Sequence, residues 1–363
     1  MRNLFRTSAV LAAGTMVVAM AGPAQAAPDD TSARWLTRQL TNGLVHNDQF
    51  DFDDYGLTAD TAFALKEIGG QAAAVGDIRQ ALAQHVDSWT TGVDFGSTDV
   101  FAGSTAKAVV LAETTGADPR AFGGVNLVGR LNKRVSATAP TVGRIQDKTA
   151  GQDFANVIGQ AFAAQGLSVA GSGKADEAVR FLLKQQCASG YFRLNFAAKT
   201  APNQTCDGGD RATTSAPDTD VTALAVLSLT AVPRKTAAVR TAITDAVEWL
   251  KRRQKANGSF GGGTATEASN SNSTGLAGWA FGKTGACGAA VKAARWVRDL
   301  QVAGAAPGTP LAGENGAIAY DSERLAAARA DGIGVPERDQ WRRATAQAAP
   351  ALSNLRIAAC RAS

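Results

Sequence analysis

The sequence predicts an all-α fold in which six helical hairpins close into a two-layered ring. Three observations lead to this prediction. A helical unit recurs along the chain, an alanine-rich apolar helix lies between successive copies, and no segment shows the alternating, β-branched pattern of a strand. The 363-residue chain is long enough for one large domain of this kind. We therefore expect a single domain over residues 27–363, preceded by a short leader.

The recurring unit is a helix that carries an aromatic or leucine pair, then a glutamine one turn on, then a glycine turn. Its clearest copy runs from Trp249 through Gln254 to Phe260. Such helices have charges on one side and Trp, Leu or Val on the other, which is typical of an outer layer. The other copies, some of them weaker, begin at Trp35, His85, Leu127, Phe181 and Trp296.

Between these copies lies a second kind of helix, apolar nearly all round and rich in alanine. Each opens on a capping type such as Asp, Ser or Asn, and most close on glycine. A helix without a polar face is typical of a buried inner layer. The six predicted inner helices lie within residues 59–70, 103–116, 153–167, 218–232, 272–285 and 321–333.

The stretch from Gln254 to Phe260 resembles the repeat of squalene cyclases and prenyltransferases, and looser copies run from Gln39 to Gly43 and from Gln186 to Phe192. The resemblance covers essentially the whole mature chain and implies an (α/α)6 toroid. It also implies that the repeat glutamine bonds the start of a neighbouring helix. Because binders and enzymes share this toroid, the resemblance predicts the fold and not the function.

The first 26 residues have the pattern of a secretory leader. Arg2 and Arg6 precede an apolar run over residues 9–21, and residues 24–26 read Ala-Gln-Ala, a typical cleavage site. The run is too short to span a bilayer. We expect an exported chain that starts at Ala27, with no stable membrane insertion. Loss of two arginines with the leader lowers the formal net charge from +5 to +3, which gives no reason to expect a nucleic-acid partner.

Four cysteines in an exported chain predict two disulfides. Cys187 and Cys206 flank one polar loop, so the simplest of three connectivities pairs them with each other and pairs Cys287 with Cys360. A bridge that closes some twenty residues contributes about 3 kcal/mol by the chain-entropy relation. Oxidised cysteines are not available as thiolate ligands or nucleophiles.

The sequence predicts no metal ion and no other cofactor. A zinc site of the prenyltransferase kind needs Asp, Cys and His together, but the only histidines, His46 and His85, lie far from every cysteine. Oxygen ligands around Asp218 and Asp220 lack the spacing of a helix-loop-helix calcium site. A turn followed by a helix cap is the simpler interpretation of these two carboxylates.

The stretch DFDDYGLTADT places Asp51, Asp53 and Asp54 directly before a predicted helix. It fits the D-x-D-D pattern of class II terpenoid cyclases, which implies an acid that protonates an alkene or epoxide. That chemistry needs an aromatic-lined cavity, yet only 6% of the residues are aromatic, and the chain has room for one toroid only. A polar loop leading into a capped helix is the competing interpretation.

In a ring of hairpins all inner helices run the same way, so their N-termini meet at one opening. We expect Asp54, Asp60, Asp153, Asp220, Ser273 and Asp321 at this opening, as helix caps or as ligand contacts. A small or medium ligand that is polar or partly anionic fits such a place. The predicted ligand-binding residues are Asp54, Tyr55, Asp60, Phe192, Asp220, Trp279 and Tyr320.

These observations predict an exported toroid that binds a ligand without transforming it. Three alternatives stay open: a terpenoid cyclase whose acid belongs to the cluster from Asp51 to Asp54, a polysaccharide-active toroid enzyme, and a cell-envelope interaction scaffold. Cobalamin carriers are similar in having a toroid outside the cell. They add a β domain, however, and nothing after residue 330 has the character of one.

Overall fold

The computed structural model describes residues 27–356, so the predicted leader and Cys360 lie outside the described residues. Within this range, fourteen α-helices dominate and the strands are short. The strands β1 (Leu40–Thr41), β2 (Leu44–Asn47) and β3 (Phe52–Asp53) form one antiparallel sheet in the order β1-β2-β3. None of the described helices combines the length and the apolar character needed to cross a membrane.

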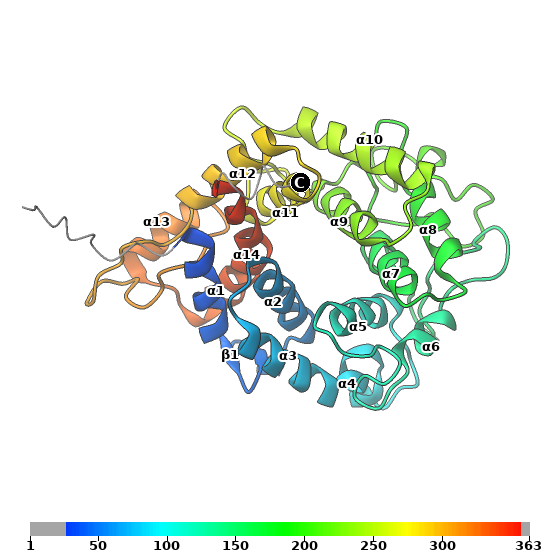
Figure 1. Ribbon diagram of the computed structural model, residues 1–363, viewed down its shortest axis with the longest axis horizontal. Coiled ribbons are helices and arrows are strands. Elements are labelled where there is room, and N and C mark those ends of the chain that lie inside the picture. The colour runs from blue at the N-terminus through cyan, green and yellow to red at the C-terminus, as the bar shows by residue number, and fades with distance from the viewer. Residues whose placement is uncertain (1–26, 357–363) are drawn as a thin grey trace, which may run out of the picture.

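Six helices surround a central opening and six more pack outside them (Figure 1). The inner helices are α2 (Tyr55–Ile68), α5 (Ala102–Thr114), α7 (Val157–Val169), α9 (Thr219–Ala231), α11 (Ser271–Lys283) and α14 (Val335–Leu352). The outer helices are α1 (Pro28–Arg38), α3 (Ala72–Gln84), α6 (Leu127–Asn132), α8 (Ala175–Lys184), α10 (Ala237–Arg253) and α12 (Cys287–Asp299). The short α4 (Val86–Thr90) follows α3. The predicted (α/α)6 toroid is confirmed.

Small residues allow the inner helices to pack closely. A Cβ added at Gly159 of α7 would lie 2.9 Å from the Cα of Gly103 in α5, and one at Gly275 of α11 would lie 2.3 Å from the Cα of Ala348 in α14. Real Cβ atoms do not approach backbone this closely. The alanine and glycine content of these helices therefore has a geometric cause: six helices can close a ring only where their backbones approach.

The repeat glutamines join neighbouring hairpins, as the resemblance implied. Gln254 Nε2 donates to the carbonyl oxygens of Gly258 and of Ala289 at the start of α12, both at 3.0 Å. Gln186 makes the equivalent two bonds, the second of them to the first turns of α10, at 2.9 Å. Gln39 differs, because its Oε1 accepts from Arg342 of α14 at 3.3 Å.

The sixth inner helix is not the predicted one. Residues 321–333 form α13 (Ser322–Asp331), which lies outside the ring (Figure 1) and buries only Leu325 and Ala328. The inner position is taken by α14, which packs against α11 and α2. Capping signals at both ends marked α13 correctly as a helix, but they carry no information about its layer. The charged first half of α14 hid the apolar, alanine-rich second half that faces the ring.

The predicted disulfide between Cys187 and Cys206 is confirmed, with a Cα–Cα distance of 4.8 Å. Its loop is also held by Arg193, whose side chain is completely buried. Arg193 Nη2 donates to Gln185 Oε1 at 2.7 Å and to the carbonyl oxygen of Gln204 at 3.0 Å. The predicted partner of Cys287 lies outside the described residues.

Candidate functional site

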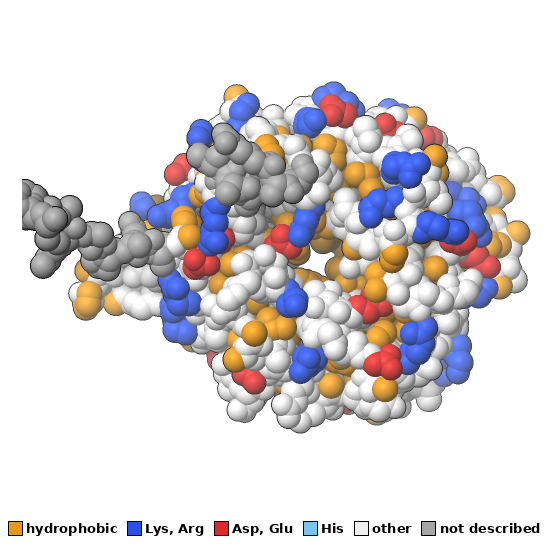
Figure 2. All heavy atoms as spheres, in the orientation of Figure 1, with side chains coloured by type: hydrophobic (Ala, Val, Ile, Leu, Met, Phe, Trp, Pro, Cys, Tyr) orange, Lys and Arg blue, Asp and Glu red, His pale blue; other side chains and the backbone are white. Residues whose placement is uncertain are grey.

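One central cavity of about 640 Å³ is lined by all six inner helices. The space-filling view shows the ring hollowed at its centre (Figure 2). Pockets of this volume accommodate small organic ligands. The cavity is therefore the first place to examine for function.

Much of the cavity wall is apolar. The rings of Phe63 on α2 and Phe162 on α7 stack with their centroids 6.1 Å apart. Leu224 and Leu227 contribute from α9, where a spacing of three residues places them on one face. Trp279 contributes from α11, and its buried indole Nε1 has no hydrogen-bond acceptor among residues 27–356. An indole N–H donates only, so it is available to an acceptor on a ligand.

Two ion pairs and one further lysine add charge to this wall. Lys107 Nζ lies 2.7 Å from Asp60 Oδ1, and Lys283 Nζ lies 2.7 Å from Glu67 Oε2. Lys66 is exposed at the cavity, and no described acidic residue pairs with it. With three lysines against two carboxylates, the lining carries a net positive charge.

Side chains cap the N-termini of four of the six inner helices, α2, α7, α9 and α11. Asp54 caps α2 as predicted, with its Oδ1 accepting from the Leu57 amide at 2.7 Å. Three other inner helices are capped by neighbours of the predicted residues, since each cap must directly precede the first helical turn. Asn156 caps α7, where Asp153 was expected, and Asn270 caps α11, where Ser273 was expected. Asp218 caps α9, where Asp220 was expected. Asp321 caps α13 and not an inner helix.

The carboxylates of the DFDD stretch are engaged in local contacts. Asp53 Oδ1 lies 2.9 Å from His46 Nδ1, and this contact raises the pKa of His46. The side chain of Asp51 is 98% exposed. Asp54 accepts from both the Leu57 amide and the Arg343 guanidinium. None of the three aspartates lines the central cavity. This arrangement is that of a loop leading into a capped and ion-paired helix.

Of the predicted ligand residues, Asp60 and Trp279 line the cavity. Tyr55 instead stacks on His85, with ring centroids 5.5 Å apart. Phe192 differs most from the expectation, because it is completely buried. As the aromatic residue of a repeat, it packs between hairpins and has no surface that faces the cavity.

Asp220 lies one turn before Leu224, on the cavity-facing side of α9. Its Oδ1 is buried and has no hydrogen-bond partner among the described residues. Burial raises the pKa of Asp220 to about 6, and the Asp218 carboxylate adds to the rise. The Ser273 hydroxyl opposes it, facing the carboxyl without a well-formed hydrogen bond.

A glycine loop covers this carboxyl. A Cβ at Gly262 would lie 3.0 Å from Ser273 Oγ and 3.1 Å from Asp220 Oδ2. The loop therefore approaches both side chains as closely as a backbone without Cβ allows. Burial raises the pKa of the Tyr320 phenol, and the nearby charge of Asp220 adds to the rise. This predicted residue therefore also lies at the Asp220 end of the ring.

Sequence reasoning missed Phe63, Phe162 and the three lysines of the cavity. A signal for the lysines was present. Each is the one basic residue of a mainly apolar helical segment, as in ADTAFALKEIGG and GSTAKAVVLAETTG. A lysine in a helix without a polar face either lies unpaired in the core or points into a polar cavity. Because burial of an unpaired charge costs much free energy, such a lysine indicates a cavity.

No protein-family model and no curated protein matches the sequence. Solved structures do match its fold. Type II terpene cyclase MstE from Scytonema, as a variant in complex with its substrate geranylgeranyl dihydroxybenzoate, matches with a TM-score of 0.61 at 15% identity, covering 92% of this chain and 96% of that chain. Unsaturated glucuronyl hydrolase from Bacillus sp. GL1 matches with a TM-score of 0.57 at 10% identity, covering 89% of this chain and 95% of that chain.

The matches to both chains are nearly complete, so the three chains are of similar length. A type II cyclase of about this size exists, which removes the objection that one toroid is too small for such an enzyme. Identities this low establish architecture and not activity. The protein therefore shares the squalene cyclase-like α/α toroid fold of a terpene cyclase and of toroid glycosidases.

Proposed function

We propose that this protein binds an amphipathic small molecule in the central cavity, with its apolar body along the aromatic wall and its acidic group at the lysines. The observation that carries the proposal is the union of both kinds of lining in one cavity of about 640 Å³. An apolar core has no need of lysines, and a solvated charged surface has no need of stacked aromatic rings.

The apolar wall supplies most of the binding free energy. Burial of apolar ligand surface contributes roughly 25 cal/mol per Å². Phe63 and Phe162 offer stacked rings, and Leu224 and Leu227 extend the apolar surface onto α9. The unpartnered indole N–H of Trp279 adds one directional donor for an ether, hydroxyl or carbonyl oxygen.

The lysines position the acidic group. Lys107 is already satisfied, since its Nζ bonds both Asp60 at 2.7 Å and the Gly56 carbonyl oxygen at 2.9 Å. Lys283 is paired with Glu67, but its side chain is 46% exposed against 17% for Lys107, and Lys66 has no acidic partner in the described chain. We therefore place the ligand acid at Lys66 and Lys283, near the C-terminal ends of α2 and α11.

The neighbouring cyclase supports this ligand class. Its complex holds geranylgeranyl dihydroxybenzoate, a long hydrocarbon chain attached to an acidic aromatic head. An apolar chain with an acidic head matches the wall and lysines described above. A chain-like or prenylated acid is thus the preferred ligand.

Calorimetric titration of the mature protein with dodecanoate tests the proposal. We expect binding that weakens at least fivefold in Phe162→Ser and Lys283→Ala, and that is also weaker for dodecanol. Lys184→Ala is the matched control, because Lys184 is exposed on outer helix α8. Equal affinity of all three variants and the wild type for dodecanoate would remove the central cavity as the site.

A second candidate function, acid-catalysed isomerisation of the bound ligand, is favoured by Asp220. A carboxyl with a pKa of about 6 and a free oxygen, one turn from the cavity wall, is suited to donate a proton. Asp54 is a weaker candidate, because both of its oxygens are engaged as acceptors. Incubation with geranylgeranyl dihydroxybenzoate, followed by chromatography for products of unchanged mass, tests this candidate. Activity should be lost in Asp220→Asn and kept in Asp54→Asn, and the reverse result would return the acid to the DFDD stretch.

A further inference from the structure

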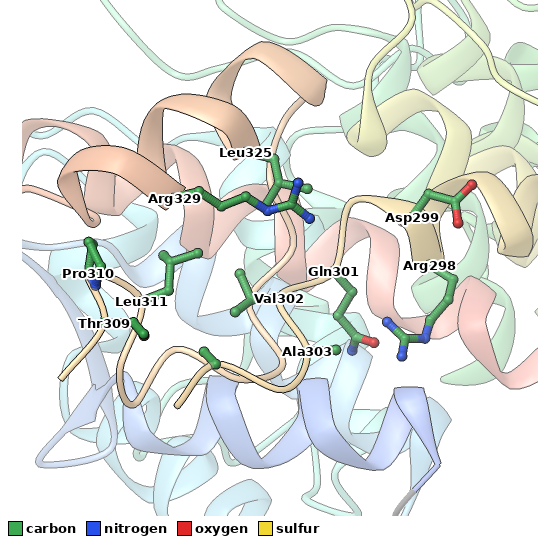
Figure 3. A pocket seen from close by; sticks show the side chains of 11 residues that line it. Arg298, Asp299, Gln301, Val302, Ala303, Thr309, Pro310, Leu311, Leu325 and Arg329 are labelled. Carbon is green, nitrogen blue, oxygen red and sulfur yellow. The ribbon is translucent and has the colours of Figure 1, made fainter. Parts of the chain in front are cut away.

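A second pocket, of about 710 Å³, lies outside the ring between the end of α12, the loop after it and α13 (Figure 3). Its floor is formed by Val302, Leu311 and Leu325, which are 4%, 6% and 4% exposed. No residue lines both this pocket and the central cavity. Because α13 is not one of the twelve ring helices, the pocket is an addition to the toroid and not part of its lumen.

Two arginines face this apolar floor from different elements. Figure 3 shows Arg329 extending from α13 past Leu325, while Arg298 extends from α12 toward the same space from the other side. Neither guanidinium makes a hydrogen bond or an ion pair within residues 27–356. Asp299 is the one acidic residue of the lining and is exposed. The pocket therefore has a net positive charge and donors that no described residue uses.

We propose that this pocket binds a small organic carboxylate, with the acid between Arg298 and Arg329 and the hydrocarbon part on the floor. Guanidinium groups suit this role, because their planar donors match the two oxygens of a carboxylate. The apolar floor favours ligands that also carry a hydrocarbon part, which a cationic surface alone does not select. A ligand gains from Val302, Leu311 and Leu325 only if it carries apolar surface next to its charge. The volume lies within the range of small-molecule pockets.

Titration of the mature full-length protein with 3-phenylpropionate at low salt tests this proposal. Arg298→Ala and Arg329→Ala should each raise the dissociation constant about fivefold, as expected for loss of one partly exposed ion pair. The neutral isostere 3-phenylpropanamide should bind at least tenfold more weakly, since it lacks the charge. Arg295→Ala on α12 and Arg324→Ala on α13 are matched controls, because both arginines are exposed and neither lines the pocket.

Several results would overturn the proposal. These are the absence of binding by the wild type at 10 mM probe, an unchanged affinity in both pocket variants, and equally tight binding of inorganic phosphate, which would mean that the floor plays no part. Loss of binding in Lys283→Ala, but not in Arg298→Ala, would instead place the probe in the central cavity. Thermal unfolding of each variant checks that the substitutions leave the fold intact.

Discussion

Gln301 Nε2 donates a hydrogen bond to the backbone carbonyl oxygen of Pro28 at 2.7 Å, across 273 positions of sequence. The same nitrogen bonds Ser32 Oγ at 2.6 Å. Through these contacts the turn after α12 is joined to the start of α1, so the first and last hairpins close the ring. The repeat that begins at Trp296 lost the glycine spacing in sequence but kept the function of its glutamine.

Replacement of this glutamine should weaken the closure of the ring. We expect Gln301→Leu to lower the free energy of unfolding by about 1–3 kcal/mol, because the Pro28 carbonyl oxygen and Ser32 Oγ each lose a hydrogen bond and Ser32 keeps only its bond to the Gly316 carbonyl oxygen. Urea unfolding measures the change. Gln84→Leu, at an exposed position on α3, is the control and should stay within about 0.5 kcal/mol of the wild type. A loss below 0.5 kcal/mol for Gln301→Leu would show that closure does not depend on this contact.

Two glycine substitutions should have opposite effects on stability. Gly275→Ala places a Cβ 2.3 Å from the Cα of Ala348, so α11 and α14 must move apart. We expect destabilisation by about 1–3 kcal/mol. Gly76→Ala, inside outer helix α3 with no atom within 4 Å, should instead stabilise by about 0.5–1 kcal/mol. Thermal and urea unfolding of both variants measure these changes. Unchanged or increased stability of Gly275→Ala would contradict the close approach of α11 and α14.

The buried Arg193 should be indispensable for the disulfide loop. Arg193→Met removes the donors to Gln185 Oε1 and to the Gln204 carbonyl oxygen, at 2.7 and 3.0 Å. Gln185 Oε1 is then unpaired in the interior, while the Gln204 carbonyl oxygen keeps only its bond from Gln185 Nε2 at 3.2 Å. The expected loss is about 3 kcal/mol in urea unfolding under oxidising conditions. Arg180→Met, on the exposed side of α8, serves as the control. A loss under 1 kcal/mol would mean that the disulfide alone holds the loop.

Stability should fall as the pH rises, because several carboxyls have raised pKa values, and the rise is largest for Glu113 and Asp220. Burial raises the pKa of Glu113 to about 8 from an ordinary value of 4.5, with Arg120 opposing, and both of its oxygens lack partners in the described chain. Between these two values the folded protein holds a proton that the unfolded chain releases, so ionisation destabilises the fold. Because Glu113 is only partly buried, solvent screening reduces the effect, and the expected loss is on the order of 2 kcal/mol between pH 5 and pH 8.

Melting temperatures at pH 5, 6.5 and 8 check this prediction. Glu113→Gln should flatten the profile over the whole range. Asp220→Asn should flatten it only below about pH 6, because the pKa of Asp220 is raised from 3.8 to about 6. A wild-type profile that rises over this range would show the opposite sign and contradict both assignments.

Local patterns were sufficient to predict much of this molecule. Apolar, alanine-rich segments with caps predicted five of the six inner helices. A helix that is buried on all faces is apolar on all faces, and this can be seen in the sequence of each helix alone. The Asp54 cap and the Cys187–Cys206 bridge were also predictable, because each joins residues close in sequence. The sixth inner helix was not, because α13 and α14 compete for one place and only packing against α11 and α2 decides between them.

The candidate site shows the same division. The sequence by itself determined that polar residues cap inner helices such as α2 and α9, since capping is a local requirement. Only the tertiary structure decided that Arg343 binds Asp54, because these residues lie far apart along the chain. It also decided that Asp220 Oδ1 is buried with no partner among the described residues. It also decided that Lys66, Lys107 and Lys283 share one cavity, since lysines on three separate helices come together only when the ring closes.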